Sequence, residues 1–127
     1  MLLTFDQVAE LLDEIIESFP PPLFEELNGG VNLLDEAVPD PEIPRLYTMG
    51  HYCHDYLGRY INLYYGSFAA MAKLEFWTFE DWKYQLRKTS AHELTHHMET
   101  RSGLHALDDQ DAEEMAAWRE ERKAEDG

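Results

Sequence analysis

Cysteine is nearly absent from this sequence of 127 residues: Cys53 stands alone, so no disulfide bond can form within the chain. No apolar run approaches the roughly 18 residues of a membrane-spanning helix, and the first residues, MLLTFDQ, lack the basic and apolar segments of a signal peptide. Repeats and low-complexity linkers are also missing. We therefore expect a single domain over residues 1–127, located in the reducing cytoplasm and without a membrane partner.

Basic residues are scarce as well. Ten Lys and Arg stand against 26 Asp and Glu, which gives a formal net charge of −16. A nucleic-acid partner would require a basic surface, so this composition argues against one. Apolar residues make up 44% of the chain and aromatic residues 13%, which is enough for a packed core.

Two helices are clearly marked. Thr4 and Gln7 match a capping box, and apolar residues follow at helical spacing until the three prolines at 20–22 end the pattern. A second, longer helix is predicted to begin at Thr78, with Trp77 and Trp82 at the spacing of a hydrophobic staple. Nothing breaks this helix before Gly103, which we expect to end it.

The middle of the chain predicts a small sheet. Candidate strands cover residues 31–34, 45–49 and 59–65, the last closed by Gly66. Residues 23–30 resemble a short helical turn, and residues 35–44 contain three prolines and are expected to form a loop. Residues 50–58 are expected to be a hairpin connection longer than a tight two-residue turn. An acidic helix is predicted from about residue 109, mainly over 112–123.

The stretch HELTH, from His92 to His96, carries the most specific chemistry. On a helix, positions i and i+4 share one face, so His92 and His96 can present two imidazoles to one metal ion. Glu93 is turned about 100° from His92, where it can deprotonate a metal-activated water as general base. The alternative for the same residues is a solvated, histidine-rich helix face.

Several blocks, in the same order, resemble the bacterial minimal zincin-like metallopeptidases. These are the N-terminal helix, ELNGGVNLL, LGRYINLYYGSF and HELTHHME, which together span most of the chain. The resemblance implies an α+β fold, with a short mixed sheet packed on the N-terminal helix and a long HExxH helix that holds Zn²⁺. It also implies hydrolysis of peptide bonds, with a peptide or protein as substrate.

The third metal ligand is where the sequence departs from that family. The commoner family pattern is HExxHxxGxxD, but here Glu99 occupies the glycine position and Ser102 the aspartate position. Glycine follows instead at Gly103, and LDDQDAEEM resembles the acidic segment that follows the family's aspartate. By this resemblance Asp108 is the first candidate for the third ligand.

Glu99 is the rival, because it lies seven residues after His92 on the same helix face and could bind the ion or orient His96 from behind. Other carboxylates and one imidazole of the following segment remain open as ligands: His105, Asp109 and Asp111. Two histidines and a carboxylate also suit nickel, cobalt or manganese.

Other residues of metal-binding type have plainer interpretations. His97 points away from the HExxH face and is expected to be a core or surface histidine. His51, Cys53 and His54 could form a second metal cluster, but incidental polar residues in a hairpin loop are the better interpretation. The segment RYINLYYGSF is the candidate edge strand on which an extended substrate would lie, with Arg59, Tyr64 and Tyr65 nearby.

The sequence thus predicts a zinc metallopeptidase with Glu93 as the catalytic base and with His92, His96 and Asp108 or Glu99 as ligands. Two other classes stay open. The chain could be a catalytically silent zinc-binding interaction module, because the usual third-ligand position is rewritten. It could also be a structural domain that binds no metal.

Overall fold

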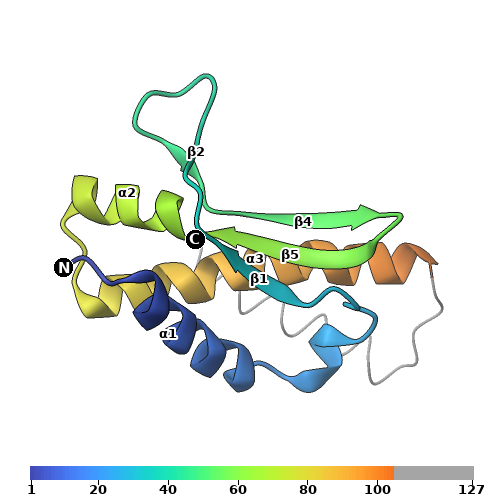
Figure 1. Cartoon of the computed structure of the whole chain (residues 1–127). Coiled ribbons are helices and arrows are strands. Elements are labelled where there is room, and N and C mark those ends of the chain that lie inside the picture. Colours follow the sequence, from blue (N-terminus) through green and yellow to red (C-terminus); the bar gives the residue numbers. More distant parts are fainter. Residues whose placement is uncertain (105–127) are drawn as a thin grey trace.

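The computed structural model describes residues 1–104, and Figure 1 shows the arrangement of their helices and strands. The elements in chain order are α1 (Phe5–Ser18), the 3-10 helix η1 (Pro21–Phe24), β1 (Val31–Leu34), β2 (Val38–Pro39), β3 (Tyr47–Thr48), β4 (Gly50–Asp55), β5 (Gly58–Tyr64), α2 (Tyr65–Glu75) and α3 (Phe79–Leu104). The predicted α+β class is confirmed. The acidic helix predicted from about residue 109 lies outside the described residues.

The main sheet has three strands in the order β1-β5-β4. β1 runs parallel to β5, and β4 runs antiparallel to it, so the sheet is mixed. β2 and β3 form a separate antiparallel pair of two residues each, and the segment that joins them projects away from the main sheet in Figure 1. Within the described part of the chain, β4 is therefore an edge strand and β5 is central.

The start of α1 follows the sequence closely. Gln7 donates its backbone N–H to Oγ1 of Thr4 over 3.2 Å, and Thr4 donates its backbone N–H to Oε1 of Gln7 over 2.8 Å. This reciprocal pair satisfies two amides that the helix itself leaves without partners, which confirms the predicted capping box. The apolar stripe of α1 is buried at Val8, Leu11, Leu12 and Ile15.

The start of α3 also confirms its prediction. The rings of Trp77 and Trp82 are in contact, as a hydrophobic staple requires, with centroids 5.2 Å apart and ring planes almost perpendicular. Thr78 and Asp81 add a reciprocal cap, with distances of 2.8 and 3.2 Å between backbone nitrogen and side-chain oxygen. The far end differs, because α3 continues through Gly103 to Leu104. The expectation that Gly103 ends the helix is wrong.

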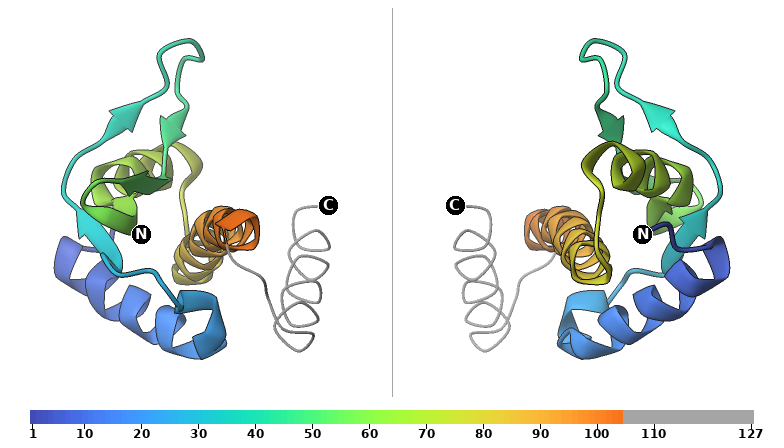
Figure 2. Two further views of the ribbon diagram at one scale, coloured as in Figure 1. Left: turned by 90° about the vertical axis from the view of Figure 1, so that its right-hand side faces the viewer. Right: turned by 90° about the vertical axis from the view of Figure 1, so that its left-hand side faces the viewer.

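The core lies between α1, α3 and the inner face of the sheet. Figure 1 shows α3 passing lengthwise beneath β4 and β5, and Figure 2, which looks nearly along α3, shows α1 beside it. Side chains from all these elements and from α2 are fully buried: Val8, Ile61, Leu63, Phe68, Trp82, Leu86, Leu94 and Met98. The long helix is thereby held against the sheet along its length.

Residues 50–58 are not the long connection that the sequence suggested. They contain β4, and the register pairs Asp55 with Gly58, so only Tyr56 and Leu57 form the turn. The polar residues misled the prediction because an edge strand can leave residues of both faces exposed to solvent. His51 and His54 lie on opposite faces of β4 and are both exposed, whereas Tyr52 is partly buried.

Three further predictions need correction. The expected loop at 35–44 contains β2, where Pro39 is tolerated because a strand at a sheet edge need not donate every N–H. The strand expected at 45–49 is reduced to Tyr47–Thr48.

Helix α2 was not predicted, and Gly66, expected to close a strand, lies in its first turn. A Cβ at Gly66 would stand 2.6 Å from the backbone nitrogen of Ala37, so glycine serves close packing there.

Candidate metal centre

Helix α3 brings His92, Glu93 and His96 together as the HExxH spacing predicts. The Nε2 atoms of the two histidines are 3.3 Å apart, and their rings are perpendicular with centroids 4.8 Å apart. One ligand atom from each of the three residues can be chosen so that all lie within 4.8 Å of one another. Both imidazoles are exposed, whereas the glutamate is buried.

The geometry of the two imidazoles fits a tetrahedral metal ion. Two nitrogens bound at about 2.05 Å to one ion, with a tetrahedral angle between them, lie about 3.3 Å apart. The observed Nε2–Nε2 distance matches this value without any movement of the side chains. The donor set of two neutral imidazoles next to a carboxylate also suits zinc. The residues present therefore fit the ion that the motif implies.

The carboxyl group of Glu93 lies in a largely buried environment. Only 6% of the residue is exposed, and this burial raises the pKa of its carboxyl group above the usual range. His92, His96 and His51 oppose the shift in pKa through their charges, and a hydrogen bond from the Tyr52 backbone opposes it further. Because burial is the largest effect, the carboxylate is a stronger base than an exposed glutamate.

Glu99 lies behind His96 rather than inside the cluster. Its Oε2 is 3.8 Å from Nδ1 of His96, the ring nitrogen on the side away from His92. A carboxylate on this side favours a proton on Nδ1 and leaves Nε2 free for an ion. The structure thus places the Glu99 carboxylate beside Nδ1 of His96, at the distance of an ion pair. Asp108, His105, Asp109 and Asp111 lie outside the described residues.

The strand nearest to the motif is β4, not the one expected from the sequence. β5 is paired on both sides, with β1 and with β4, so it has no free edge for a substrate. The expectation that RYINLYYGSF forms the shelf is therefore wrong. Two of its named residues are engaged elsewhere: Arg59 faces Glu26 at 3.7 Å, and Tyr65 donates its hydroxyl to the Leu3 carbonyl over 2.6 Å. Tyr64 does lie near the motif, with its hydroxyl 3.1 Å from Nδ1 of His51.

The free edge of β4 faces the candidate centre. Tyr64 donates its N–H to the Met49 carbonyl just before β4 begins, and backbone pairs in an antiparallel ladder alternate from that point. The backbone groups of Gly50, Tyr52 and His54 accordingly point away from β5. The hydrogen bond between the Tyr52 backbone and Glu93 agrees with this alternation.

Gly50 allows β4 to approach α3 closely. A Cβ at this position would lie 2.7 Å from Cδ2 of Leu63 and 3.1 Å from Cγ2 of Thr89. The first distance is too short for two carbon atoms and the second is tight, so a side chain here would crowd Leu63 of β5 and Thr89 of α3. The close approach defines one wall of the cleft above the motif.

Two hollows open along this cleft, and Glu93 lines both. The Lys88 hollow, of about 410 Å³, is lined by Met49, Gly50, Gln85, Lys88, Thr89, His92 and Glu93. The Glu99 hollow, of about 470 Å³, is lined by His51, Tyr52, Glu93, His96, Glu99 and Thr100. The candidate centre therefore lies between two spaces large enough to receive side chains of an extended ligand.

His97, the neighbour of His96, belongs to the core, which is one of the two places expected for it. It is fully buried, and its Nε2 lies 2.7 Å from the carbonyl oxygen of Glu25. A carbonyl can only accept, so Nε2 carries the proton and Nδ1 accepts from the Tyr52 hydroxyl, 2.8 Å away. Burial lowers the pKa of His97, which keeps the ring neutral.

The second cluster considered in the sequence does not form. Within residues 1–104, His51, Cys53 and His54 are not grouped as possible metal ligands, and all three lie on β4 rather than in a loop. His51 was undervalued, however, since it lines the Glu99 hollow and its Nδ1 is 3.1 Å from the Tyr64 hydroxyl. GHYCHD shows no two-residue alternation of polar and apolar residues, so its sequence did not reveal this strand.

Among the described residues, no helix is long and apolar enough to cross a membrane. No protein-family model matches the sequence, and no curated protein matches it. Among solved structures, a conserved hypothetical protein from Thermo thermophilus is similar, with 31% sequence identity and a TM-score of 0.69. The match covers 80% of this chain and 100% of the other.

At this identity and coverage, the chain belongs to the same protein family as the protein from Thermo thermophilus. The description of that relative names no activity, ligand or partner. Function must therefore be argued from the centre on α3.

Proposed function

We propose that this protein is a zinc-dependent hydrolase of the zincin-like kind that cleaves peptide bonds. His92 and His96 would hold the ion, and Glu93 would act as general base. The observation that carries the proposal is the 3.3 Å separation of the two Nε2 atoms beside a buried carboxylate with a raised pKa. A merely solvated helix face would not require the carboxylate to be buried.

Asp108 remains the proposed third ligand, and Glu99 is proposed as the group that orients His96. The 3.8 Å distance from the Glu99 carboxylate to Nδ1 of His96 supports this division of roles. Ligating histidines commonly donate their second ring N–H to a carboxylate, which fixes the tautomer and the ring orientation.

The chemistry assigned to the chain's own residues is proton transfer and positioning. A zinc ion held at this place would lower the pKa of a bound water to about 7 and polarise the substrate carbonyl. Glu93 would accept the proton of the attacking water and deliver it to the leaving amine. Its burial supports this role, because a raised pKa makes the carboxylate a better proton acceptor.

The substrate is proposed to be an extended peptide or protein segment that adds to the free edge of β4. Gly50 and His54 direct backbone donors and acceptors to this edge, and strand addition is a common way to bind extended chains. The Tyr52 N–H is already bonded to the Glu93 carboxylate, so Glu93 lies next to this edge, which supports its proposed role. No nucleic-acid or membrane partner is proposed, and the cytoplasmic location remains a prediction.

The first test is metal content, measured by elemental mass spectrometry on protein purified without chelator. Near-stoichiometric zinc in the wild type, lost in His96→Gln, would support the centre, and activity would then be compared for the wild type and Glu93→Gln. Glu93→Gln should retain zinc and lose at least about 100-fold in turnover, because general-base catalysis contributes that factor or more. Glu80→Gln, an exposed change on the same helix, is the matched control. Unchanged turnover in Glu93→Gln would refute the mechanism.

One observation favours a second candidate, a catalytically silent zinc-binding interaction module. Helix α3 runs unbroken to Leu104, and Glu99 stands where the related pattern has the helix-breaking glycine. This module would bind zinc with the same two histidines and hydrolyse no peptide. A peptide library incubated with zinc-loaded protein separates the two functions, since only the hydrolase produces new amino termini.

A further inference from the structure

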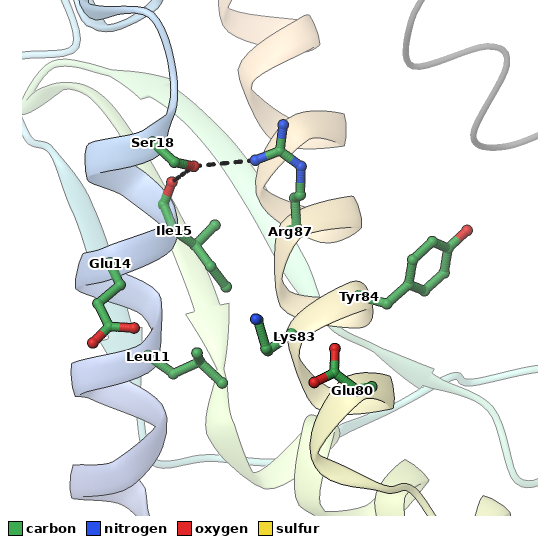
Figure 3. A pocket seen from close by; sticks show the side chains of 8 residues that line it. All are labelled: Leu11, Glu14, Ile15, Ser18, Glu80, Lys83, Tyr84 and Arg87. Carbon is green, nitrogen blue, oxygen red and sulfur yellow. Dashed lines mark hydrogen bonds between the residues drawn. The ribbon is translucent and has the colours of Figure 1, made fainter.

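One side of helix α3 faces away from the other described elements. In both views of Figure 2, α1, α2 and the sheet lie on one side of α3, and within residues 1–104 no helix or strand lies on the opposite side. Figure 3 shows the same division near the start of α3: Arg87 reaches Ser18 of α1, whereas the ring of Tyr84 points away from α1. We call the side that carries Tyr84 the outer face of α3.

Two small residues of the outer face are nevertheless buried. Thr95 lies two positions from both Glu93 and His97, which bind β4, so it points about 160° away from each around the helix. Ala91 lies one turn before Thr95 on the same side. Ala91 is 2% exposed and Thr95 is 4% exposed. A side chain is buried only where other atoms cover it, so residues 105–127 are the candidate cover.

Residues 105–127 are long enough to reach these positions. Their first four residues, when extended, span about 13 Å, which matches the roughly 12 Å along the axis from Leu104 back to His96. The helix predicted over 112–123 can then run antiparallel to α3, as helices joined by a short connection do. Its 12 residues cover roughly 18 Å, or the length of α3 from His96 back to Tyr84.

The apolar residues of this segment match the outer face in size. Met115 and Trp118 are three positions apart and therefore share one side of a helix. In the antiparallel arrangement they lie close to the levels of Thr95 and Ala91. Small residues let a second helix approach closely and leave room for large apolar side chains opposite them.

The charges of the two segments are also complementary. Residues 82–91 of α3 contain three cations, Lys83, Arg87 and Lys88, and no carboxylate. All three lie over aromatic rings and contribute a positive field at this end of the helix. Residues 105–127 contain nine Asp and Glu against three Lys and Arg. The field therefore attracts the acidic segment toward the start of α3.

We propose that residues 105–127 dock along the outer face of α3 and cover Ala91 and Thr95, chiefly with Trp118. The burial of Ala91 and Thr95 supports this docking most directly, because it calls for a cover that the described elements do not provide on this side.

The docking has a consequence for the proposed metal centre. Asp108 is the fourth residue after Leu104, so the return of the chain brings it to the level of His96. The docked segment thereby places the proposed third ligand, and release of the segment should weaken zinc binding. This consequence rests on the proposed function, whereas the docking itself does not.

Acrylamide quenching of tryptophan fluorescence tests the docking in the full chain. Trp77 is 4% exposed and Trp82 is fully buried, so the difference between the wild type and Trp118→Phe reports on Trp118. This difference should be quenched several-fold less in the folded protein than in the urea-unfolded chain. Equal quenching in the two states would overturn the docking.

Substitutions on α3 then locate the docked segment. Thr95→Arg introduces a long, charged side chain into the outer face and should raise the quenching of Trp118 to that of the unfolded chain. Glu80→Arg is the matched control, because Glu80 is exposed in the separate groove between α1 and α3 (Figure 3). Continued protection of Trp77 and Trp82 shows that the core is intact, and Ala91→Gln is the milder variant should Thr95→Arg disturb folding. Protection of Trp118 that persists in both outer-face variants would overturn the proposed site.

Zinc affinity, measured by competition with a chromophoric chelator, tests the consequence without any turnover. Trp118→Ala should bind zinc about tenfold more weakly, as the loss of a group that supports a ligand typically causes. Trp118→Phe retains an aromatic side chain and should bind like the wild type. Unchanged affinity in Trp118→Ala would overturn the placement of Asp108 by the docked segment. A protein that shows the protection and the affinity loss but cleaves no peptide would support this inference while the hydrolase proposal fails.

Discussion

The hydroxyl of Tyr52 lies 2.8 Å from Nδ1 of His97 and joins the edge strand β4 to the helix that carries the candidate metal ligands. On its other side, the His97 imidazole donates from Nε2 to the Glu25 carbonyl over 2.7 Å. Three segments far apart in the sequence are thereby fixed relative to one another, directly beside His96. The cleft above the motif depends on this connection, because β4 forms one of its walls.

Removal of the Tyr52 hydroxyl should weaken the fold measurably. Tyr52→Phe leaves the buried Nδ1 of His97 without its donor, which should cost about 1–3 kcal/mol in the free energy of unfolding. Urea denaturation of the metal-free protein measures the change. Tyr56→Phe removes the same atom from a residue that is 95% exposed and should leave the midpoint unaltered. Equal midpoints for both variants would contradict a structural role for the bond.

Acid should destabilise the metal-free protein through His97. Its pKa is lowered in the folded state, mainly by burial, with Arg101 and Arg59 lowering it further and Glu26 and the Glu25 backbone opposing them. The stability that neutral His97 contributes is complete above the unfolded pKa of about 6.5 and is lost as pH falls below that value. The expected slope reaches about 1.4 kcal/mol per pH unit.

Urea denaturation in the presence of chelator, at pH values of about 7.5, 6.5 and 5.5, measures this slope. His97→Gln should be less stable at the highest pH but should show a flatter dependence on pH, because the amide does not titrate. His54→Gln, an exposed change on β4, should retain the wild-type slope. A wild-type slope that persists in His97→Gln would assign the effect to other groups.

Zinc should stabilise the folded protein if His92 and His96 hold it. A ligand that binds only the folded state adds about 2.7 kcal/mol at a free concentration of about 100 times its dissociation constant. Differential scanning fluorimetry with and without zinc should show a higher melting temperature for the wild type and for His54→Gln. The increase should be lost in His96→Gln, and an unchanged increase there would place the metal elsewhere.

Arg101 should matter more than an ordinary surface arginine. It is 4% exposed, and its guanidinium donates to the Glu25 carboxylate over 2.9 Å and to the Pro22 carbonyl over 3.1 Å. Arg101→Gln removes this link between α3 and η1 and leaves the Pro22 carbonyl without its donor, which should cost about 1–3 kcal/mol. Chemical denaturation provides the value, and Lys83→Gln on the exposed face is the control.

Local rules of the sequence anticipated the parts of the fold that depend on neighbouring residues. The capping pair of Thr4 and Gln7 and the staple of Trp77 and Trp82 involve residues three to five positions apart, so their spacing predicts their contact. The facing pair of His92 and His96 follows in the same way from the pitch of a helix.

Pairings between distant segments could not be obtained in this way. The role of Gly66 as a close-packing residue depends on Glu36 and Ala37, about thirty residues earlier, and the sequence offers no sign of that approach. His51 became part of the cleft only because β4 pairs with β5 and lies over α3. The assignment of the substrate edge to β5 failed for the same reason, since strand order is a property of the folded sheet.

The sequence by itself determined the two helices, their caps and the face on which His92, Glu93 and His96 meet, because helical geometry is periodic and local. Tertiary structure alone decided which strand borders that face and how deeply Glu93 is buried. Burial and strand order arise from contacts between residues far apart in the chain. A local sequence pattern predicts neither the entropic cost of forming these contacts nor how well they pack.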